Sequence, residues 1–471
     1  MKNQIHYKYL IAIIYAVVLF LDRLDLTVVN VALPTVARYF GVSIVATDWI
    51  SLAFLLALAV SIPISTWLAE RFGFKRIYII AMLLFGAGST FCAFAGSLNQ
   101  LILLRFIQGI GGGMLMPVGM TMIYRVYDKS EYASITSFTF LPALVAPALA
   151  PFLGGVLLDT FDSWRFVFVF SGPISLVLAI VALIFLHEEP HQSRYPLDWK
   201  GFVLASVTLI DVFYSLSGLA KYGFDSMVGM EFLALIPLVC LFIWVETHQE
   251  HPLIDLSFFR NKLFVQANLV QLCFQFCHMG AIFLVGLFLQ AGIGFAATMA
   301  GLMMGMQAIS AMMVSRYSVR MFNRYGPRRP IIIGLLGVAI FSPMLMLINS
   351  PDKWWLGLVL FFVRGLFSGL CGTPIQTISV IAFDKKEIGT INTIFNTCRQ
   401  VSISLGVAAS SVLIALGFHL AHTPSAASIP IDKAFQVFAY GFWMLPIVAL
   451  IGVGVMCRFI VPPKTNEETK C

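Results

Sequence analysis

The sequence predicts an all-α integral membrane protein with fourteen transmembrane helices. The first reason is composition, because 59% of the 471 residues are hydrophobic, 11% are charged, and the mean hydropathy is +0.90. A soluble domain carries roughly 25% charged residues, so this chain could not cover a soluble surface and its apolar excess must face lipid. The second reason is that the apolar stretches are long and continuous, which favours helices over the short alternating segments of a β-barrel.

Fourteen apolar stretches of about 20 residues can be placed along the chain. They lie near residues 9–32, 47–69, 76–95, 99–124, 133–158, 164–186, 201–220, 229–246, 264–291, 297–316, 330–349, 354–376, 390–418 and 435–461. The first is expected to be retained, because the run after Lys2 and Lys8 is too long for a signal peptide and lacks a small-residue cleavage site. An even number of spans places both termini on one side of the membrane.

The lysines and arginines indicate which side that is. Of the 30, 21 fall in the loops that share a side with the termini, five in the opposite loops and four inside spans. Cytoplasmic loops carry the excess of basic residues, so both termini are expected in the cytoplasm. The net charge of +7 does not indicate a nucleic-acid partner, because the basic residues lie in short loops instead of on a soluble module.

An internal repeat divides the chain. Residues 71–76, RFGFKR, follow the second span, and residues 324–329, RYGPRR, follow the tenth. The fourth and twelfth spans each carry an arginine near the outer end and then run through glycines to a proline, namely Arg105 with Pro117 and Arg364 with Pro374. We therefore expect an N-terminal six-helix half at residues 1–190, two inserted spans at 191–263 and a C-terminal six-helix half at 264–471. Duplicated halves with a midplane site are a transporter architecture.

Several short segments are specific to one family. Residues 24–34 read LDLTVVNVALP, 68–76 read LAERFGFKR, 105–109 read RFIQG and 150–155 read APFLGG. Shorter matches lie at residues 163–168, 197–201, 252–256 and 399–400. Over its whole length the chain resembles the major facilitator superfamily, specifically its fourteen-span drug:proton antiporter branch.

The chain departs from the family pattern at three places. Thr66 and Glu70 stand where the loop motif usually has glycine and aspartate, and Ala150 stands where the fifth-span motif usually has glycine. The first span adds Asp22 and Arg23 where uncharged residues are expected. The resemblance implies the major-facilitator fold and proton-coupled export by alternating access of the two halves.

Charged residues inside the spans point to a proton-coupling site, since each costs roughly 2.5–3.5 kcal/mol to insert and needs a partner or water. Asp25 lies roughly 24 Å from the inner end of the first span at 1.5 Å per residue, a depth similar to that of Arg105. Asp22 shares its helix face, at i,i+3. We expect Asp25 or Asp22 to titrate in contact with Arg105 and Gln108. The alternatives are a static buried pair or an acid facing water at the outer mouth.

Two regions are candidates for gating. In the loop after the second span the residues that could close the cytoplasmic side are Glu70, Arg71, Gly73 and Arg76, although positive charge there also sets topology. In the fifth span they are Pro151, Gly154 and Gly155, which would bend or thin the helix, although helix packing alone could explain them.

A substrate cavity is expected to include Asn30, Arg364, Arg399 and Gln400. The two arginines could bind an anionic or polar substrate, or could simply pair with backbone carbonyls. Asp211 in the seventh span is either a second protonation site or a polar residue packed against a neighbouring helix.

Other chemistry finds little support. Cys273 and Cys277 lie four apart without a second pair, so buried thiols are expected and no metal or other cofactor. The chain has no G-x-x-x-x-G-K-[ST] phosphate loop, which disfavours an ATP-driven pump, and nothing indicates an enzyme.

The leading interpretation is a proton-coupled exporter of small amphipathic compounds in a bacterial cytoplasmic (inner) membrane. Its partners would be the substrate, protons and the bilayer, and the resemblance admits a periplasmic adaptor and an outer-membrane channel. The runner-up is a transporter of one metabolite, such as a siderophore, in either direction. A receptor or scaffold that no longer transports is a third hypothesis.

Overall fold

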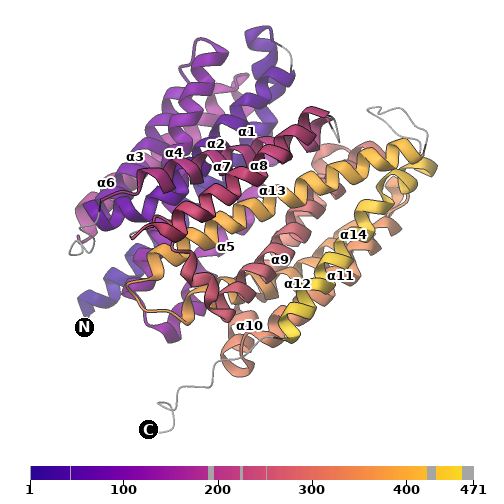
Figure 1. Ribbon diagram of the computed structural model, residues 1–471. Coiled ribbons are helices and arrows are strands. Elements are labelled where there is room, and N and C mark those ends of the chain that lie inside the picture. The colour runs from indigo at the N-terminus through magenta and orange to yellow at the C-terminus, as the bar shows by residue number, and fades with distance from the viewer. Residues whose placement is uncertain are drawn as a thin grey trace.

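The computed structural model describes residues 2–42, 44–188, 196–222, 226–250, 252–421 and 431–458, which form helices and the turns between them (Figure 1). The long helices are α1 (Lys2–Phe40), α2 (Ile44–Phe72), α3 (Phe74–Cys92), α4 (Leu98–Val126), α5 (Tyr132–Phe161), α6 (Arg165–Phe185), α7 (Trp199–Tyr222), α8 (Ser226–His248), α9 (Lys262–Leu287), α10 (Ala297–Tyr325), α11 (Arg328–Met344), α12 (Trp354–Ile381), α13 (Ile388–Leu420) and α14 (Ile431–Cys457). Short turns of 3₁₀ or π type are η1 (Lys129–Glu131), η2 (Leu256–Arg260), η3 (Phe288–Gly292), η4 (Leu345–Leu347) and η5 (Pro351–Lys353).

The described helices confirm a multi-pass membrane protein. Within the described residues, eleven helices are long and apolar enough to cross a membrane. Helices α1, α5 and α10 are not among the eleven, and α1 carries Asp22, Arg23 and Asp25 inside its apolar stretch. The structure therefore supports eleven of the fourteen predicted spans.

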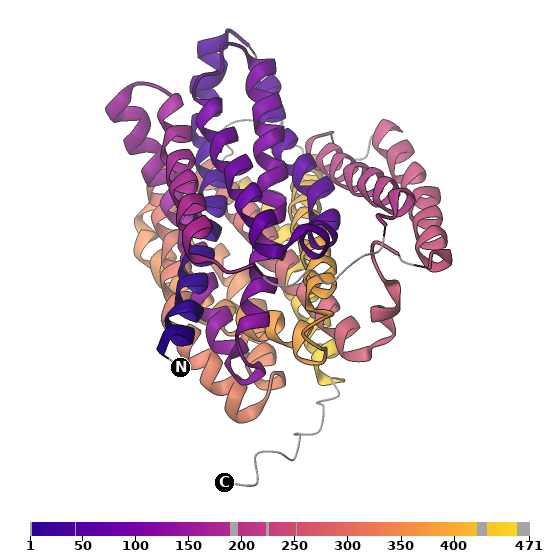
Figure 2. The ribbon, with the colours of Figure 1, turned by 90° about the vertical axis from the view of Figure 1, so that its left-hand side faces the viewer.

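The helices pack in a pattern that repeats eight helices along the chain. In the first group, α1 packs on α5, α2 on α4 and α3 on α6; in the second, α9 packs on α13, α10 on α12 and α11 on α14. Between the groups α5 packs on α10 and α2 on α13. Helix α7 packs on α2 and α13, while α8 packs mainly on α7, so this pair stands beside the bundle (Figure 2).

The repeated loop motif has a glycine with positive φ in both groups. Gly73 lies between α2 and α3 with φ +101°, and Gly326 lies between α10 and α11 with φ +76°. A side chain is strained at positive φ, which is why both copies of the motif need glycine here. At Gly73 a Cβ would also collide with the carboxylate of Glu188.

Glycine packing fixes how α4 corresponds to α12. A Cβ on Gly109 would collide with the carbonyl oxygen of Phe54, and one on Gly365 would collide with that of Gln307. Phe54 and Gln307 occupy equivalent places, each 17 residues before the first arginine of its loop motif. Gly365 is therefore the counterpart of Gly109.

This register corrects the sequence-based match between the two span arginines. With Gly365 at the place of Gly109, Arg364 occupies the place of Gln108, and Phe361 occupies that of Arg105. The two arginines therefore lie nearly one helical turn apart in their repeats, and their surroundings differ accordingly.

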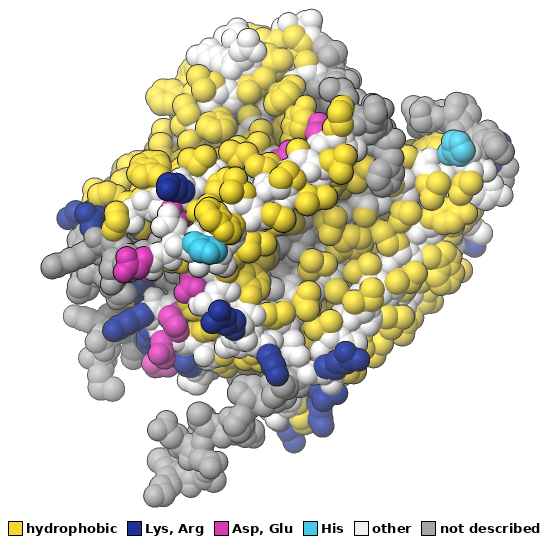
Figure 3. All heavy atoms as spheres, in the orientation of Figure 1, with side chains coloured by type: hydrophobic (Ala, Val, Ile, Leu, Met, Phe, Trp, Pro, Cys, Tyr) yellow, Lys and Arg dark blue, Asp and Glu magenta, His cyan; other side chains and the backbone are white. Residues whose placement is uncertain are grey.

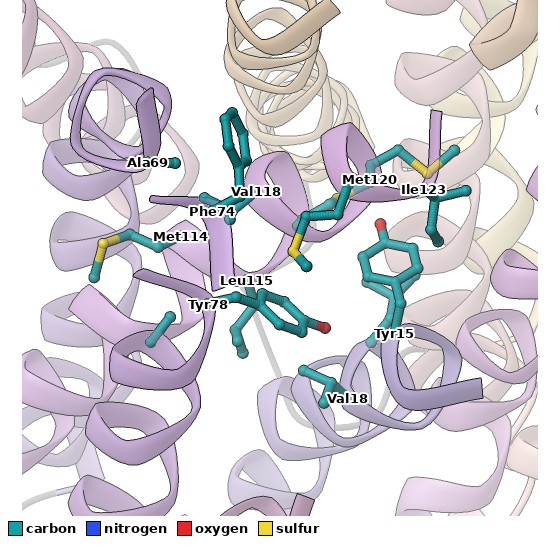
Figure 4. Close-up of a cluster of buried hydrophobic side chains, with 14 of the residues drawn as sticks. Tyr15, Val18, Ala69, Phe74, Tyr78, Met114, Leu115, Val118, Met120 and Ile123 are labelled. Atoms are coloured by element: carbon teal, nitrogen blue, oxygen red, sulfur yellow. The ribbon is translucent and has the colours of Figure 1, made fainter. Parts of the chain in front are cut away.

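The two groups share an apolar core on the terminus side, which we define as the side where α1 begins and α14 ends. There Tyr15, Tyr78 and Leu115 of the first group converge (Figure 4). Phe383 and Ile388 of the second group belong to the same cluster. Most Lys and Arg side chains visible in Figure 3 also gather at this end.

On the opposite side, called the far side, the apolar cores of the two groups are separate. One cluster, which includes Val28 and Trp164, draws all its members from residues 20–170. The other, which includes Phe288 and Phe438, draws all its members from residues 281–445. The described apolar clusters thus join the groups on the terminus side and not on the far side.

Candidate functional site

Three of the predicted coupling residues meet at a buried ion pair between α1 and α4. Asp25 is 0% and Arg105 1% exposed. Arg105 Nη1 donates to Asp25 Oδ2 at 2.5 Å and to Gln108 Oε1 at 2.8 Å. Arg105 Nε lies 3.5 Å from the carbonyl oxygen of Ile50 on α2. The structure thus brings Asp25, Arg105 and Gln108 together, while their role in proton coupling stays a prediction.

Hydroxyls from two other helices complete this pair, and sequence reasoning missed them. Ser171 Oγ on α6 donates to Asp25 Oδ1 at 3.1 Å, and it lies 2.9 Å from Ser89 Oγ on α3. The ring of Phe54 lies 4.5 Å from the Arg105 guanidinium carbon. Both carboxylate oxygens are therefore occupied, and the pair is sealed by protein. No motif marks either serine, so only the packing of α6 on α1 and α3 could have found them.

Asp22 lies in a different environment from Asp25, although both face α4. It is 3% exposed, and its Oδ2 lies 3.5 Å from Arg23 Nε. Its Oδ1 is buried without a hydrogen-bond partner in the described structure. Removing that oxygen from water without a partner is costly, so a ligand or water is expected beside it.

A small central cavity lies between the two helix groups next to Asp22. Its volume is about 20 Å³, enough for about one water molecule. The lining residues are Asp22, Arg23, Leu58, Ile62, Gly112, Gly113, Met116 and Pro117 from the first group, and Asn396, Arg399 and Gln400 from the second. The prediction that Arg399 and Gln400 face a cavity is consistent with this lining.

Two arginines from opposite groups meet at one sulfur atom in this cavity. Arg23 Nη2 lies 3.5 Å from Met116 Sδ, and Arg399 Nη2 contacts the same sulfur. A thioether is a weak acceptor. Arg399 is 8% exposed and its Nε has no hydrogen-bond partner within the described residues.

Arg364 does not line this cavity, contrary to the prediction. It is 1% exposed and lies inside the second group. It donates to Gln307 Oε1 at 2.5 Å, Ser342 Oγ at 3.0 Å and the carbonyl oxygen of Cys277 at 3.2 Å. Neutral acceptors from three helices hold it, which agrees with the alternative of a fixed arginine paired in part with backbone.

The terminus side is closed by hydrogen bonds between the groups. Thr66 Oγ1 on α2 donates to the carbonyl oxygen of Gly389 on α13 at 3.0 Å and lies 2.5 Å from Thr393 Oγ1. Asn392 Nδ2 donates to Thr121 Oγ1 at 3.3 Å. Thr66 is the residue that replaces the usual glycine of the loop motif, so this departure adds a contact across the groups.

The predicted gating residues of the loop make local contacts. Glu70 Oε1 lies 3.9 Å from Arg125 Nη2 of its own group, and Arg76 Nε lies 3.6 Å from Glu188 Oε2. Arg71 is exposed. The ion pair of Glu70 stays within the first group, although its Oε1 also lies beside Gly389 of α13 in the second group.

Some predicted residues cannot be placed in full. Asn30, Pro151 and Gly155 lie in helices, but their side chains are outside the part of the chain that the structure describes. Gly154 is buried in α5. Asp211 on α7 has a buried Oδ2 with no hydrogen-bond partner among the described residues. The described part of the chain contains no group of three His, Cys, Asp or Glu residues that could hold a metal ion.

Comparison with known proteins places this geometry in context. A model of the Major Facilitator Superfamily matches residues 15–407. A relative from Klebsiella pneumoniae (strain 342), described as a candidate multidrug resistance protein, MdtD, is 31% identical over 453 residues, covering 96% of this chain and 94% of the relative. A relative of the same description from Yersinia pestis (strain Pestoides F) is 29% identical over 451 residues, covering 95% of each.

Two solved structures share the fold. The human organic anion transporter MFSD10 matches with a TM-score of 0.62 at 15% identity, covering 95% of this chain and 99% of that one. The proton:xylose symporter XylE matches with a TM-score of 0.65 at 14% identity, covering 97% and 96%. At these identities the likeness concerns architecture alone.

Proposed function

Because the chain belongs to the major facilitator superfamily, we propose that it is a proton-coupled secondary transporter that exports small amphipathic compounds, drugs among them. The description of its relatives as candidate multidrug resistance proteins supports the substrate class. The observation that carries the proposal is the charged cavity between two helix groups whose described apolar cores merge on the terminus side and stay separate on the far side. Such a layout suits transport and not catalysis.

Alternating access explains the asymmetry of the contacts. The proposed moving bodies are residues 1–190 and 264–471, with residues 191–263 as the insertion. In this state Thr66, Thr393 and Asn392 close the terminus side, while the apolar cores of the far side stay separate. With both termini in the cytoplasm of a bacterial inner membrane, the cavity would next open toward the periplasm.

Asp25 is the proposed proton carrier. Its carboxylate joins α1 to Arg105 on α4 and to Ser171 on α6, so adding a proton would weaken contacts between helices. Asp22 pairs with its own neighbour Arg23, so its protonation changes no ion pair between helices. Since a bound ligand or proton shifts a conformational equilibrium only through differential contacts, Asp25 suits coupling better, and Asp22 is assigned to the cavity.

The test is dye efflux from proteoliposomes with an imposed pH gradient. Wild-type protein should move rhodamine 6G until an ionophore collapses the gradient. Asp25→Asn should lose gradient-driven flux but keep exchange of dye for dye, whereas Asp22→Asn should keep gradient dependence. If Asp25→Asn stays fully coupled, the assignment of the proton to Asp25 is wrong.

A transporter of one metabolite remains the second candidate, and the ionic lining of the cavity favours it, since three charged residues would bind a polar group. Comparing metabolites exported by a deletion strain and its parent separates the two candidates. Partners can be sought in the same strains, because cross-linking would capture a periplasmic adaptor or an outer-membrane channel.

A further inference from the structure

We propose that the transported compounds are organic anions, and that their carboxylate binds between Arg23 and Arg399 when the central cavity, about 20 Å³ in this state, widens. This rests on the proposed transport function and names its substrate class. Four observations carry it: the shared sulfur contact, the charge of the lining, the buried polar atoms without partners, and the contrast with Arg364.

The first observation is that Arg399 is poorly satisfied and that Arg23 is satisfied only in part, since its Nε pairs with Asp22 Oδ2 at 3.5 Å. Each offers five N–H donors in a planar fork that suits a carboxylate. Yet Arg23 from α1 and Arg399 from α13 both use one donor on the thioether of Met116. A carboxylate at this place would replace a weak acceptor with a charged, bidentate one.

The second observation is the charge of the lining. Among the eleven lining residues one is acidic, Asp22, and two are basic, Arg23 and Arg399. With all three ionised the lining carries a charge of +1. A bound monoanion brings the cavity to neutrality, whereas a bound cation would raise the charge to +2 in surroundings where charge is poorly solvated.

The third observation is a set of buried polar atoms without hydrogen-bond partners. Three lie on lining residues: Asp22 Oδ1, Asn396 Oδ1 and Arg399 Nε. The Oη of Tyr15, which lies two helical turns before Asp22 on α1, is a fourth. Buried polar groups are almost always hydrogen-bonded, so this cluster between the two groups indicates a ligand site. Arg399 Nε and Tyr15 Oη can donate to a carboxylate, whereas Asp22 Oδ1 and Asn396 Oδ1 are acceptors that a water molecule or a hydroxyl of the substrate would satisfy.

The fourth observation is the contrast with Arg364, which shows how this fold satisfies a structural arginine. Arg364 donates to three acceptors on three residues of its own group. Arg399 is similarly buried but has only the sulfur of Met116 and an unpartnered Nε. An arginine kept only for packing would resemble the first case.

Binding is tested on the purified full-length protein with benzoate, benzylamine and sodium chloride at matched ionic strength. Benzoate should raise the Tm in a saturable way by about 3–6 °C, because a ligand that binds only the folded state stabilises it by mass action. Benzylamine and chloride should not. Arg399→Gln should lose the benzoate shift, and Arg399→Lys, which keeps the charge but not the fork, should retain part of it.

The proposal is overturned if benzoate gives no shift, if benzylamine gives the same shift, or if Arg399→Gln keeps it. The cavity then holds water only. Arg399→Lys guards against a misfolded Gln variant, since its own Tm and its partial benzoate shift are read in the same assay.

Transport of two xanthene dyes separates this inference from the function on which it rests. Proteoliposomes should move anionic carboxyfluorescein at least tenfold faster than cationic rhodamine 6G. If rhodamine 6G moves and benzoate does not bind, export stands and the anion site falls. If neither dye moves although benzoate binds, the anion site stands and the export of amphipathic dyes falls.

Discussion

Each helix group contains one arginine that is almost completely buried, yet the two groups hold this arginine by different chemistry. Arg105 in the first group and Arg364 in the second are both 1% exposed. Arg105 meets the carboxylate of Asp25, while Arg364 meets a side-chain amide, a hydroxyl and a carbonyl. One arginine is balanced by a charge that a proton can remove, and the other is balanced by dipoles that pH does not change.

The difference teaches where a proton can act in a duplicated fold. A repeat copies helix packing, as Gly109 and Gly365 show, but the ionisable partner is present in one copy only. Under the proposed function, the first group would therefore respond to the pH gradient, and the second would be the body against which it moves.

Replacing the charged partner should have the largest effect. Asp25→Asn should reduce flux driven by a pH gradient about 100-fold, to the level of empty vesicles, because the titrating group is gone. The matched control is Gln307→Glu, which gives Arg364 a carboxylate partner in the second group. The control should remain coupled through Asp25. Equal loss in both variants would contradict the division of roles between the groups.

The second largest effect should be on stability, because removing a partner of Arg105 should cost more unfolding free energy than removing a partner of Arg364. Asp25→Ala leaves Arg105 buried without its counter-charge, which typically costs 3–5 kcal/mol, whereas Ser342→Ala removes one neutral acceptor from Arg364 and should cost about 1–3 kcal/mol. Denaturant unfolding of the purified protein measures both. The double variant Asp25→Leu with Arg105→Met should recover most of the first loss, since removing both charges removes the unpaired one. No recovery would mean that the pair contributes more than charge balance.

Sequence reasoning found the membrane class, the repeat and the family, because those depend on hydropathy, loop charge and short motifs. It also singled out Asp25 and Arg105, because both are charged residues inside apolar spans and both lie in short family motifs. It failed for Arg364, because the match rested on the order arginine, glycines, proline, and the packing of Gly365 on α10 shows that the two arginines occupy different places in the repeat. Ser171, Thr393 and Met116 were missed because their roles arise from contacts between distant helices.

Removing a hydrogen bond between the groups on the terminus side should have a smaller effect than either change at the buried arginines, and it should act on the conformational equilibrium. Thr66→Val keeps the shape but removes the hydroxyl that meets Gly389 and Thr393. Losing about 1 kcal/mol of net hydrogen bonding should raise the population that is open on the terminus side about fivefold. The readout is the rate at which a maleimide labels Cys398 in a variant without other cysteines. Thr90→Val, whose hydroxyl bonds only to Gly86 within its own helix, is the control and should label at the original rate.

The surface ion pair of the first group should have the smallest effect, and it provides a pH-dependent contrast to the buried pair. Lys8 Nζ lies 2.9 Å from Glu131 Oε2, with 26% and 43% of the side chains exposed. The pKa of Glu131 is lowered, first by the backbone N–H of Asp128 and then by Lys8, while the hydrogen bond to Glu131 raises the pKa of Lys8.

Because the pKa of Glu131 is lower in the folded protein, its contribution to stability is complete above the unfolded pKa of about 4.3 and is lost as pH falls through the folded value. The raised pKa of Lys8 acts in the opposite sense, since its contribution is lost only as pH rises above about 10.4. The difference in Tm between wild type and Glu131→Gln should therefore be constant from pH 6 to 9 and shrink below about pH 4. A difference that persisted at pH 3 would assign the stabilising contact to the backbone N–H of Asp128 in both protonation states, and not to the charge of Glu131.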